Sequence, residues 1–202
     1  MPNDTPQVMT LYHTGYQEIR EPDIRHGRKN ADFGQGFYLT PDQDFSERWG
    51  KERKGESVCV NVYRLNVSGL RVRRLERDAE WLGYILSNRR GQPDAFTDAD
   101  VIIGPIANDT MFDTLGIIGS GFLSDAEALR LLRIGPAYTQ AVIKTGRAAA
   151  QLAWQETNAL SSETVRRCGQ ALAAEEKTYM EAFAAACQAM DEKAESEANT
   201  SP

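Results

Sequence analysis

The sequence predicts an α+β fold, in which one domain of strands and helices is followed by a helical extension. In the first 155 residues, strand-like segments interchange unevenly with helix-like segments, without the regular strand–helix–strand units of a doubly wound parallel sheet. From Ser161 onward, Ala, Glu, Gln and Lys dominate, with apolar residues at near-helical spacing. We therefore expect a domain over 1–155, a helical extension over 156–192 and a disordered tail over 193–202.

Four strands are expected in the first half of the chain, with one long polar loop after the first of them. The clearest is the third strand, where Val58, Val60 and Val62 alternate as in a half-buried strand. Cys59 in the same strand is expected to be a small core residue. The strands are predicted over 8–13, 36–40, 57–65 and 70–75, and the loop over 14–33.

Two helices are expected among these strands. Thr40 is a suitable N-cap and Pro41 a suitable first helical residue, so the first helix should run to about Lys54. Phe45 and Trp49 are four residues apart and are expected on its buried face. The second helix is predicted over 79–90, with Trp81, Leu82, Ile85 and Leu86 directed inward.

The sequence predicts two strands and three helices in the second half of the domain. The strand over 101–106 contains a Gly-Pro pair, so we expect it to be bent or to lie at a sheet edge. Ser124 and Glu127 form a capping box that opens a helix. The helices are predicted over 110–119, 124–133 and 147–154, and the other strand over 139–144.

The composition is that of an ordinary globular protein. The chain has 202 residues, 41% of them hydrophobic and 26% charged, and no apolar run approaches the ~20 residues of a membrane span. The first residues lack the basic and apolar regions of a signal peptide, so we expect a cytoplasmic protein without a membrane partner. The three cysteines lie far apart, which argues against a zinc site and a disulfide framework.

The charge and the motifs exclude several classes of protein. A net charge of −6 is not that of an electrostatic nucleic-acid binder. Basic runs over 25–29, 48–54 and 71–74 are solvated faces, or one of them lines a cleft and holds a pyrophosphate or phosphodiester. The chain has no P-loop, no dinucleotide fingerprint and no His-Glu-x-x-His motif, which argues against a P-loop NTPase, a Rossmann dehydrogenase and a zincin.

His13 and Tyr38 are the first candidates for a functional site. His13 ends an apolar run in the segment 9–15, MTLYHTG, and Tyr38 follows two glycines in the segment 32–40, DFGQGFYLT. Taken alone, such a histidine is usually structural, and a Gly-x-Gly pair usually marks a turn or bulge. Together they suit a flat, charged ligand such as NAD, because tyrosine offers a stacking face and histidine a hydrogen bond.

In these segments the sequence resembles the ADP-ribosyltransferase superfamily, and it is most similar to a bacterial family in its diphtheria-toxin-like branch. Three further segments follow in the same order and extend the resemblance over about residues 9–153. These segments read DVIIGPIAND at 100–109, GFLSDAEAL at 121–129 and TQAVIKT at 139–145. The resemblance implies a split antiparallel β-sheet whose cleft holds NAD as the substrate, with no metal.

The resemblance also implies roles for individual residues. His13 would hydrogen-bond a ribose hydroxyl, and the backbone of Thr14 and Gly15 would hold the nicotinamide amide. Tyr38 would stack on the nicotinamide ring, with Gly36 beside it in the NAD-binding segment. A third residue, usually glutamate, would stabilise the positive charge that develops on the ribose as the glycosidic bond breaks.

At this third position the sequence departs from the pattern of the superfamily. The strand that should carry the glutamate has Gln140, which can hydrogen-bond ribose but adds no full charge. Asp109 is a rival candidate, although it is also placed to cap the following helix. We expect Gln140, rather than Asp109, to point into the cleft with His13 and Tyr38.

Three functions are compatible with the sequence. The leading one is a mono-ADP-ribosyltransferase that acts as a bacterial toxin or effector on an intracellular macromolecule, either protein or nucleic acid, and is neutralised by a small antitoxin or immunity protein. The second is an NAD glycohydrolase, in which water is the acceptor. The third is a non-catalytic module that binds a ligand or a partner.

Overall fold

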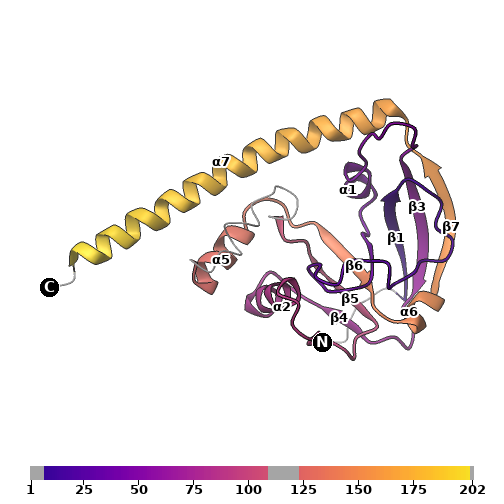
Figure 1. The fold of residues 1–202 in the computed structure, drawn as a ribbon, viewed down its shortest axis with the longest axis horizontal. Helices are drawn as coiled ribbons and strands as arrows, with labels where there is room; N and C mark the ends of the chain where they lie inside the picture. The colour runs from indigo at the N-terminus through magenta and orange to yellow at the C-terminus, as the bar shows by residue number, and fades with distance from the viewer. Residues whose placement is uncertain (1–6, 109–122, 201–202) are drawn as a thin grey trace.

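The computed structural model describes residues 7–108 and 123–200, with side chains described to residue 192. It confirms an α+β architecture with a C-terminal helix (Figure 1). The strands are β1 (Val8–Gly15), β2 (Phe37–Leu39), β3 (Cys59–Asn66), β4 (Val72–Arg74), β5 (Val101–Pro105), β6 (Thr139–Ile143) and β7 (Leu152–Ala159). The helices are α1 (Gln43–Arg48), α2 (Ala79–Arg89), α5 (Asp125–Leu132), α6 (Gly146–Ala150) and α7 (Ser162–Thr200).

The strands form two sheets that meet at one point. A three-stranded antiparallel sheet has the order β1-β3-β7, and a four-stranded sheet has the order β2-β6-β5-β4. Among the described residues, a single isolated bridge joins the two sheets, between Tyr12 of β1 and Thr40, the residue after β2. The amide of each donates to the carbonyl of the other, at 2.8 and 3.0 Å. Because β1 and β2 share a single bridge rather than a ladder, the two sheets separate immediately beside it.

The four-stranded sheet is not wholly antiparallel, which corrects the expectation from the resemblance. β4 pairs with β5 in parallel, with Val72 opposite Val101. Parallel neighbours need a long crossover connection, and the segment between these two strands contains α2. The remaining strand pairs in both sheets are antiparallel.

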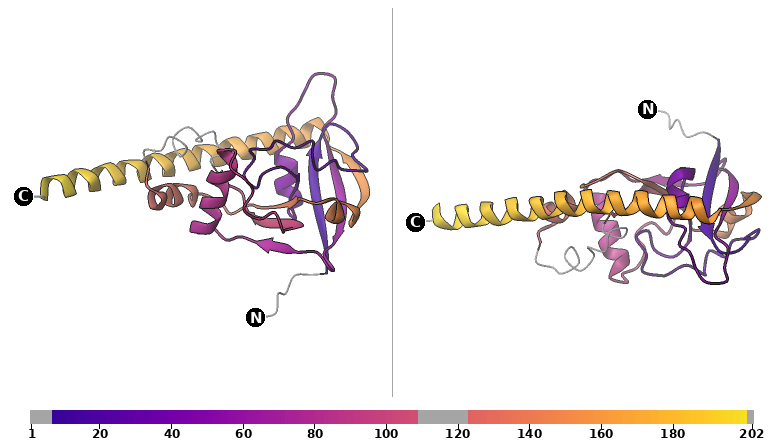
Figure 2. Two further views of the ribbon diagram at one scale, coloured as in Figure 1. Left: turned by 60° about the horizontal axis from the view of Figure 1, so that its bottom comes forward. Right: turned by 90° about the horizontal axis from the view of Figure 1, so that it is seen from above.

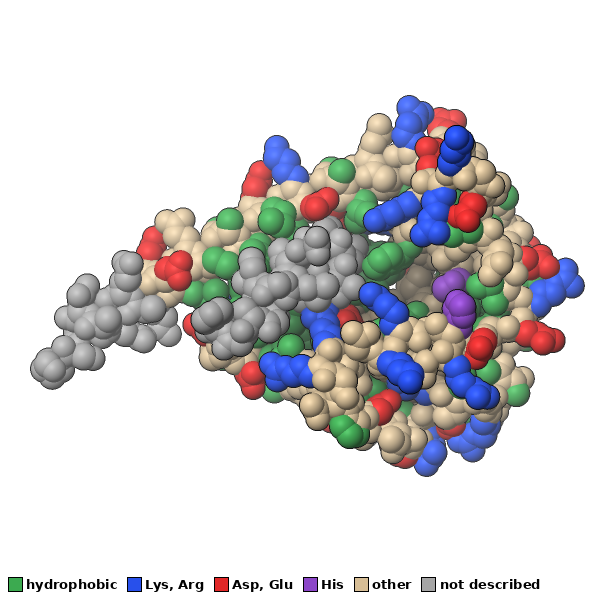
Figure 3. Space-filling model, in the orientation of Figure 1, with side chains coloured by type: hydrophobic (Ala, Val, Ile, Leu, Met, Phe, Trp, Pro, Cys, Tyr) green, Lys and Arg blue, Asp and Glu red, His purple; other side chains and the backbone are tan. Residues whose placement is uncertain are grey.

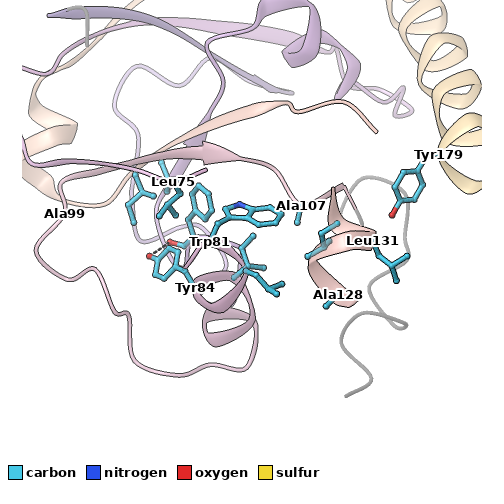
Figure 4. Close-up of a cluster of buried hydrophobic side chains, with 14 of the residues drawn as sticks. Leu75, Trp81, Tyr84, Ala99, Ala107, Ala128, Leu131 and Tyr179 are labelled. Atoms are coloured by element: carbon cyan, nitrogen blue, oxygen red, sulfur yellow. Dashed lines mark hydrogen bonds between the residues drawn. The ribbon is translucent and has the colours of Figure 1, made fainter. Parts of the chain in front are cut away.

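Two hydrophobic cores cover the two faces of the four-stranded sheet. The inter-sheet core lies against the three-stranded sheet and includes Leu11, Tyr63 and Ile103. The helical-side core lies on the other face and joins the sheet to α2, α5 and α7. Figure 4 shows this core extending from Trp81 of α2, past Leu131 of α5, to Tyr179 of α7. The sheet that carries β2 and β6 is therefore fixed from both sides.

Helix α7 runs along one side of the domain and extends beyond it (Figures 1 and 2). Tyr179 and Phe183 are buried in the helical-side core, and Val165 is buried near the start of the helix. Packing on the domain is thus one role of this amphipathic helix. No helix among the described residues is long and apolar enough to cross a membrane.

Most of the predicted elements are confirmed within one or two residues. The capping box at Ser124 is present, with the Ser124 side chain bonded to the Glu127 amide and the Glu127 carboxylate bonded to the Ser124 amide. In α2, Trp81 and Ile85 are fully buried as expected. Cys59 is buried in β3, and all three cysteines are free thiols.

Helix α1 is shorter than predicted and begins later. Its N-cap is Asp42, whose carboxylate accepts from the Phe45 amide at 2.9 Å, and it ends at Arg48. Asp42 replaces Thr40 as the cap because the Thr40 backbone is already bonded to Tyr12. Phe45 is buried as expected, but Trp49 follows the helix and is 44% exposed.

Strand β5 is an interior strand, so the expected sheet-edge position is wrong. Ile106 donates to Tyr138 of the β6 side, whereas the Ile103 carbonyl accepts from Leu75 on the β4 side. By alternation, the nitrogen of Pro105 faces the β4 side, where β4 has already ended. The proline therefore interrupts no ladder hydrogen bond.

The predicted helix over 147–154 is wrong for its second half. α6 contains only five residues, and the chain then enters β7, which pairs with β3 across a bulge between Val62 and Tyr63. The Ala-rich segment favours a helix locally, but pairing with β3 decides the structure. The predicted domain boundary at residue 155 falls inside β7.

Helix α7 is one continuous helix, and it reaches Thr200 instead of ending near residue 192. The predicted tail over 193–202 contains Ala, Glu and Lys, which favour a helix, so the segment to Thr200 continues α7. The predicted helix over 110–119 and the candidate Asp109 lie outside the described residues.

Candidate functional site

His13 lies where the two sheets separate, one residue beyond the Tyr12–Thr40 bridge. Its Nδ1 is 2.8 Å from the backbone carbonyl oxygen of Tyr38. Its ring also contacts the ring of Phe37 at a centroid distance of 4.6 Å. The structure thus brings together the two sequence motifs, although His13 meets the backbone of Tyr38 rather than its ring.

The hydrogen bond to Tyr38 determines which nitrogen of His13 carries the proton. A carbonyl oxygen can only accept, so Nδ1 must donate, and Nε2 carries the lone pair in the neutral ring. Burial lowers the pKa of His13 below its ordinary 6.5, and the Tyr38 carbonyl opposes this effect only in part. At neutral pH the imidazole is therefore neutral and presents Nε2 as a hydrogen-bond acceptor.

Thr14 and Gly15 are the last residues of β1, and neither has a side chain that is free to react. The Thr14 hydroxyl is 2.6 Å from the Ser46 carbonyl and 2.8 Å from the Ser46 hydroxyl, so it connects β1 to α1. A Cβ atom at Gly15 would lie 3.8 Å from Nε2 of His13. Glycine therefore leaves open the space in front of the free nitrogen.

The Tyr38 hydroxyl has a structural role in this site. It accepts from the Phe33 amide at 3.0 Å and donates to the Gly34 carbonyl at 2.7 Å, which anchors the loop before β2. Burial, above all, raises the pKa of Tyr38. The hydroxyl is thus unsuited to proton transfer, and the ring face is the part of Tyr38 that a ligand could use.

The two glycines before Tyr38 are required by packing and by backbone geometry. A Cβ atom at Gly36 would lie 2.6 Å from Cγ1 of Val142 and 2.7 Å from the Ile143 carbonyl, so only glycine lets this segment approach β6. Gly34 has a φ of 70°, in the left-handed region that favours glycine. These glycines hold the segment that carries Tyr38 against β6, and the expected place of Gly36 in an NAD-binding segment stays a prediction.

Gln140 shares a face of the four-stranded sheet with Tyr38. Tyr38 lies opposite Val142 in the β2–β6 register, and Gln140 is two residues before Val142, so all three side chains project to the same side. Gln140 is 6% exposed, and its Nε2 is buried. Among the described residues, no atom accepts a hydrogen bond from this nitrogen. This donor is therefore available to an acceptor such as a water molecule or a ligand.

A charged cluster that the sequence did not predict lies on the same side of β6. Arg48 of α1 donates to the Tyr138 hydroxyl at 2.6 Å and to Oε2 of Glu175 at 2.8 Å. The Tyr138 hydroxyl donates to the same Oε2 at 2.7 Å. Tyr138 also stacks on Phe45, with ring centroids 4.0 Å apart. The only sequence signal was Arg48 as the first residue of a basic run.

Figure 3 shows a hollow in the surface below helix α7, with histidine on its border and Lys and Arg side chains around it. Two cavities of about 350 Å³ lie elsewhere: one is lined by Lys29, Asn88 and Lys144, and the other by residues before β3 and at the start of α7. Neither is lined by His13, Tyr38 or Gln140. Hydrogen-bond geometry, rather than enclosed volume, therefore singles out the junction of the sheets.

Some of the other basic residues that the sequence singled out are engaged in ion pairs. Arg73 pairs with Glu80 on the surface, and Arg71 lies 3.8 Å from Asp100. Asp100 also pairs with Arg147, which with its other hydrogen bonds lowers the pKa of Asp100 to about 2. In the described part of the chain, no group of three or more His, Cys, Asp and Glu residues is arranged to hold a metal ion.

Comparison with known proteins gives one match. The profile of a family described as "Protein of unknown function (DUF3990)" matches residues 9–154, which include both motifs and β6 but not α7. No curated protein and no solved structure matches the chain. Because the matched segment is well over half of the chain, the protein belongs to this family.

Proposed function

We propose that the protein binds NAD where its two sheets separate and transfers ADP-ribose to a macromolecule. The observation that carries this proposal is the protonation state of His13. Its Nδ1 donates to the Tyr38 carbonyl, so Nε2 is a fixed acceptor beside the open space at Gly15. A ribose hydroxyl is a donor of the kind that such a nitrogen binds.

The surrounding residues suit the other parts of NAD. The ring of Tyr38 is an aromatic surface on the face of β2 opposite Phe37, whose ring contacts His13, and its hydroxyl is held by the loop bonds. Gln140 offers a buried donor on the same face as Tyr38. These groups are neutral and well fixed, which supports positioning of the substrate rather than proton transfer as their contribution.

The proposed reaction needs little from the protein beyond this positioning. The bond between nicotinamide and the ribose carbon breaks, and its electron pair leaves with nicotinamide. The ribose carbon then bonds to a nucleophilic atom of the acceptor, which loses its proton. Because charge develops on the ribose, nearby dipoles and carboxylates would accelerate the step.

The arrangement of the sheets supports the fold that the resemblance implies. In this proposal, the single Tyr12–Thr40 bridge is the point at which an ADP-ribosyltransferase-like sheet splits, and the motifs line the split. The parallel β4–β5 pair lies at the far edge of the four-stranded sheet and does not affect this region.

The proposal is tested with the purified full-length protein, NAD and a cell extract as the source of acceptors. We expect nicotinamide to be released and ADP-ribose to become attached to a macromolecule. Release of both nicotinamide and free ADP-ribose, without attachment, would instead establish a glycohydrolase. Binding of NAD without cleavage would establish a non-catalytic module, and no binding would contradict the proposal.

The biological role that we propose is that of a bacterial toxin or effector with a small neutralising partner. It rests on the resemblance alone and is tested separately. Expression of the wild type in bacteria should arrest growth, and Tyr38→Ala should relieve the arrest at an equal protein level. Equal growth of the two strains would contradict the toxin role and leave the enzymatic proposal standing.

A further inference from the structure

Glu175 of helix α7 has a carboxylate whose two oxygens lie in different environments. Oε2 accepts from Arg48 at 2.8 Å and from Tyr138 at 2.7 Å. Oε1 is buried, and no described residue donates a hydrogen bond to it. Carboxylate oxygens are strong acceptors, and burial of one without a donor is unfavourable, so this atom requires an explanation.

The structural role of Glu175 explains only Oε2. Burial and the bond to Glu175 raise the pKa of Tyr138 to about 12, so the phenol stays protonated and donates to Oε2. Arg48 supplies the positive charge that balances the carboxylate. Together these two contacts fasten α7 to α1 and β6, and neither involves Oε1.

The free oxygen belongs to the same region as Gln140. Tyr138 and Gln140 are two residues apart at the start of β6, so their side chains project to one side, although Tyr138 itself precedes the regular strand. Arg48 is two residues from Ser46, which holds Thr14 at the end of β1. Helix α1 and the start of β6 thus each contribute one residue to this cluster and one to the predicted site.

Two unpartnered buried atoms of opposite kind therefore belong to residues adjoining Tyr138, one two positions along β6 and one bonded to the Tyr138 hydroxyl through its other oxygen. Nε2 of Gln140 is a donor, and Oε1 of Glu175 is an acceptor. The described residues contain one further buried side-chain atom without a partner, on Arg77. Arg77 bonds to Asn108 and to the Pro136 carbonyl through Nη2, and within the described chain it forms no hydrogen bond or ion pair with the residues of this cluster.

We propose that Glu175 is a ligand-contacting residue of the NAD site, and that its free oxygen and the Gln140 amide together bind a neutral group that both donates and accepts a hydrogen bond. The inference rests on the proposed function and extends it to α7, which lies outside the segment matched by the family. The site is then incomplete without the C-terminal helix.

Two parts of NAD have the required chemistry. A ribose hydroxyl donates and accepts through one oxygen, and the nicotinamide carboxamide donates through nitrogen and accepts through oxygen. A phosphate is excluded as the occupant, because it would place a second negative charge next to the carboxylate. ADP-ribose carries the ribose hydroxyls and nicotinamide carries the carboxamide. Binding of these two probes therefore shows which of the two groups occupies the site.

Isothermal titration calorimetry of the full-length protein with ADP-ribose and with nicotinamide tests the inference, since neither probe contains the bond that the enzyme would cleave. Glu175→Gln keeps an oxygen for Arg48 and Tyr138 but removes the charge. We expect it to weaken binding of one probe about tenfold or more. Glu176→Gln, an exposed neighbour on α7, is the matched control and should bind like the wild type.

The pattern of affinities decides between the outcomes. Weaker ADP-ribose binding identifies a hydroxyl as the occupant, and weaker nicotinamide binding identifies the carboxamide. Unchanged binding of both probes would overturn the role of Glu175 and leave the proposed function intact. If the wild type binds neither ADP-ribose nor nicotinamide, both the role of Glu175 and the proposed function are overturned.

A second measurement on the wild type avoids the risk that Glu175→Gln does not fold. Hydrogen exchange of α7 is measured with and without a saturating concentration of the probe that binds. A ligand that contacts Glu175 should slow exchange in the helical turns around it, relative to the turns around Val165. Equal exchange in both states would contradict the inference.

Discussion

The junction of the sheets and the contact of α7 with the domain differ in how they are built. At the junction, His13 and Tyr38 lie in two motifs 25 residues apart and are joined by a bond to the backbone. At the α7 contact, Arg48, Tyr138 and Glu175 come from segments 37 to 127 residues apart and are joined through side chains. The first region is visible in the sequence, whereas the second exists only in the folded chain.

The difference also concerns what each region leaves free. At the junction, the hydroxyl and the carbonyl of Tyr38 are engaged, and the group that stays available is the neutral Nε2 of His13. At the α7 contact, the free group is an oxygen of a charged side chain. A neutral acceptor such as His13 only positions a ligand, whereas a carboxylate such as Glu175 also acts on the charge of the ligand. Substitutions in the two regions should therefore have separate effects on ligand binding and on NAD cleavage.

The largest effect is expected from loss of the free nitrogen at the junction. His13→Ala should lower the rate of NAD cleavage by about 100-fold or more, which corresponds to roughly 3 kcal/mol of activation free energy. The measurement is nicotinamide release by the purified variants. His26→Ala is the matched control, because His26 is exposed and should be dispensable. Activity of His13→Ala equal to that of the control would show that the junction is not the site.

Gln140 connects the two regions, and its replacement should have the next largest effect. Gln140→Ala should reduce NAD cleavage by about tenfold, because a donor to the ligand is lost. Its Nε2 has no partner in the described chain, so thermal stability should change little. Gln140→Glu should raise the rate if charge near the ribose is limiting. Gln155→Ala, at an exposed position of β7, is the control. If Gln140→Ala lowers the thermal stability without lowering the rate of NAD cleavage, the role of Gln140 is structural.

A smaller effect on activity is expected when only the hydroxyl of Tyr38 is removed. Tyr38→Phe keeps the ring but leaves the Phe33 amide and the Gly34 carbonyl without their partner. The free energy of unfolding should fall by about 1–3 kcal/mol, measured by urea denaturation, while NAD cleavage in the folded protein stays within a few-fold of the wild type. A 100-fold loss of activity would instead mean that the hydroxyl contacts the substrate.

The smallest effect is expected from a change of pH. Burial lowers the pKa of His13 below 6.5, and protonation would convert Nε2 from an acceptor to a donor. NAD cleavage should therefore be constant above pH 6.5 and decline as the pH falls through the lowered pKa. His13→Gln, which cannot titrate, should remove this decline in the residual activity. An acid limb that persists in His13→Gln would have to come from another group.

The same pKa gives the sign of the stability change. The unfolded chain binds a proton at His13 below pH 6.5, whereas the folded chain resists it until a lower pH. Stability from this residue is therefore fully present above pH 6.5 and is lost as the pH falls toward the folded pKa. Urea denaturation of the wild type and His13→Gln at pH 7.5 and 5.5 would measure the difference.

The sequence by itself determined the local features of this protein. Alternation in β3, the capping box at Ser124 and the apolar face of α2 were predicted because each depends on residues close in the chain. The motifs around His13 and Tyr38 were predicted for the same reason. The reason for the glycine at position 36 was not predicted, because it is the close approach of this segment to β6 that excludes any side chain there.

Only the tertiary structure decided the rest. The segment that forms β7 has Ala and Gln residues that favour a helix, and pairing with β3 overrides this preference. Pro105 lies in an interior strand because its neighbour β4 is short. The free oxygen of Glu175 depends on how a long helix packs across α1 and β6. Such contacts join residues far apart in the chain, and no local pattern encodes them.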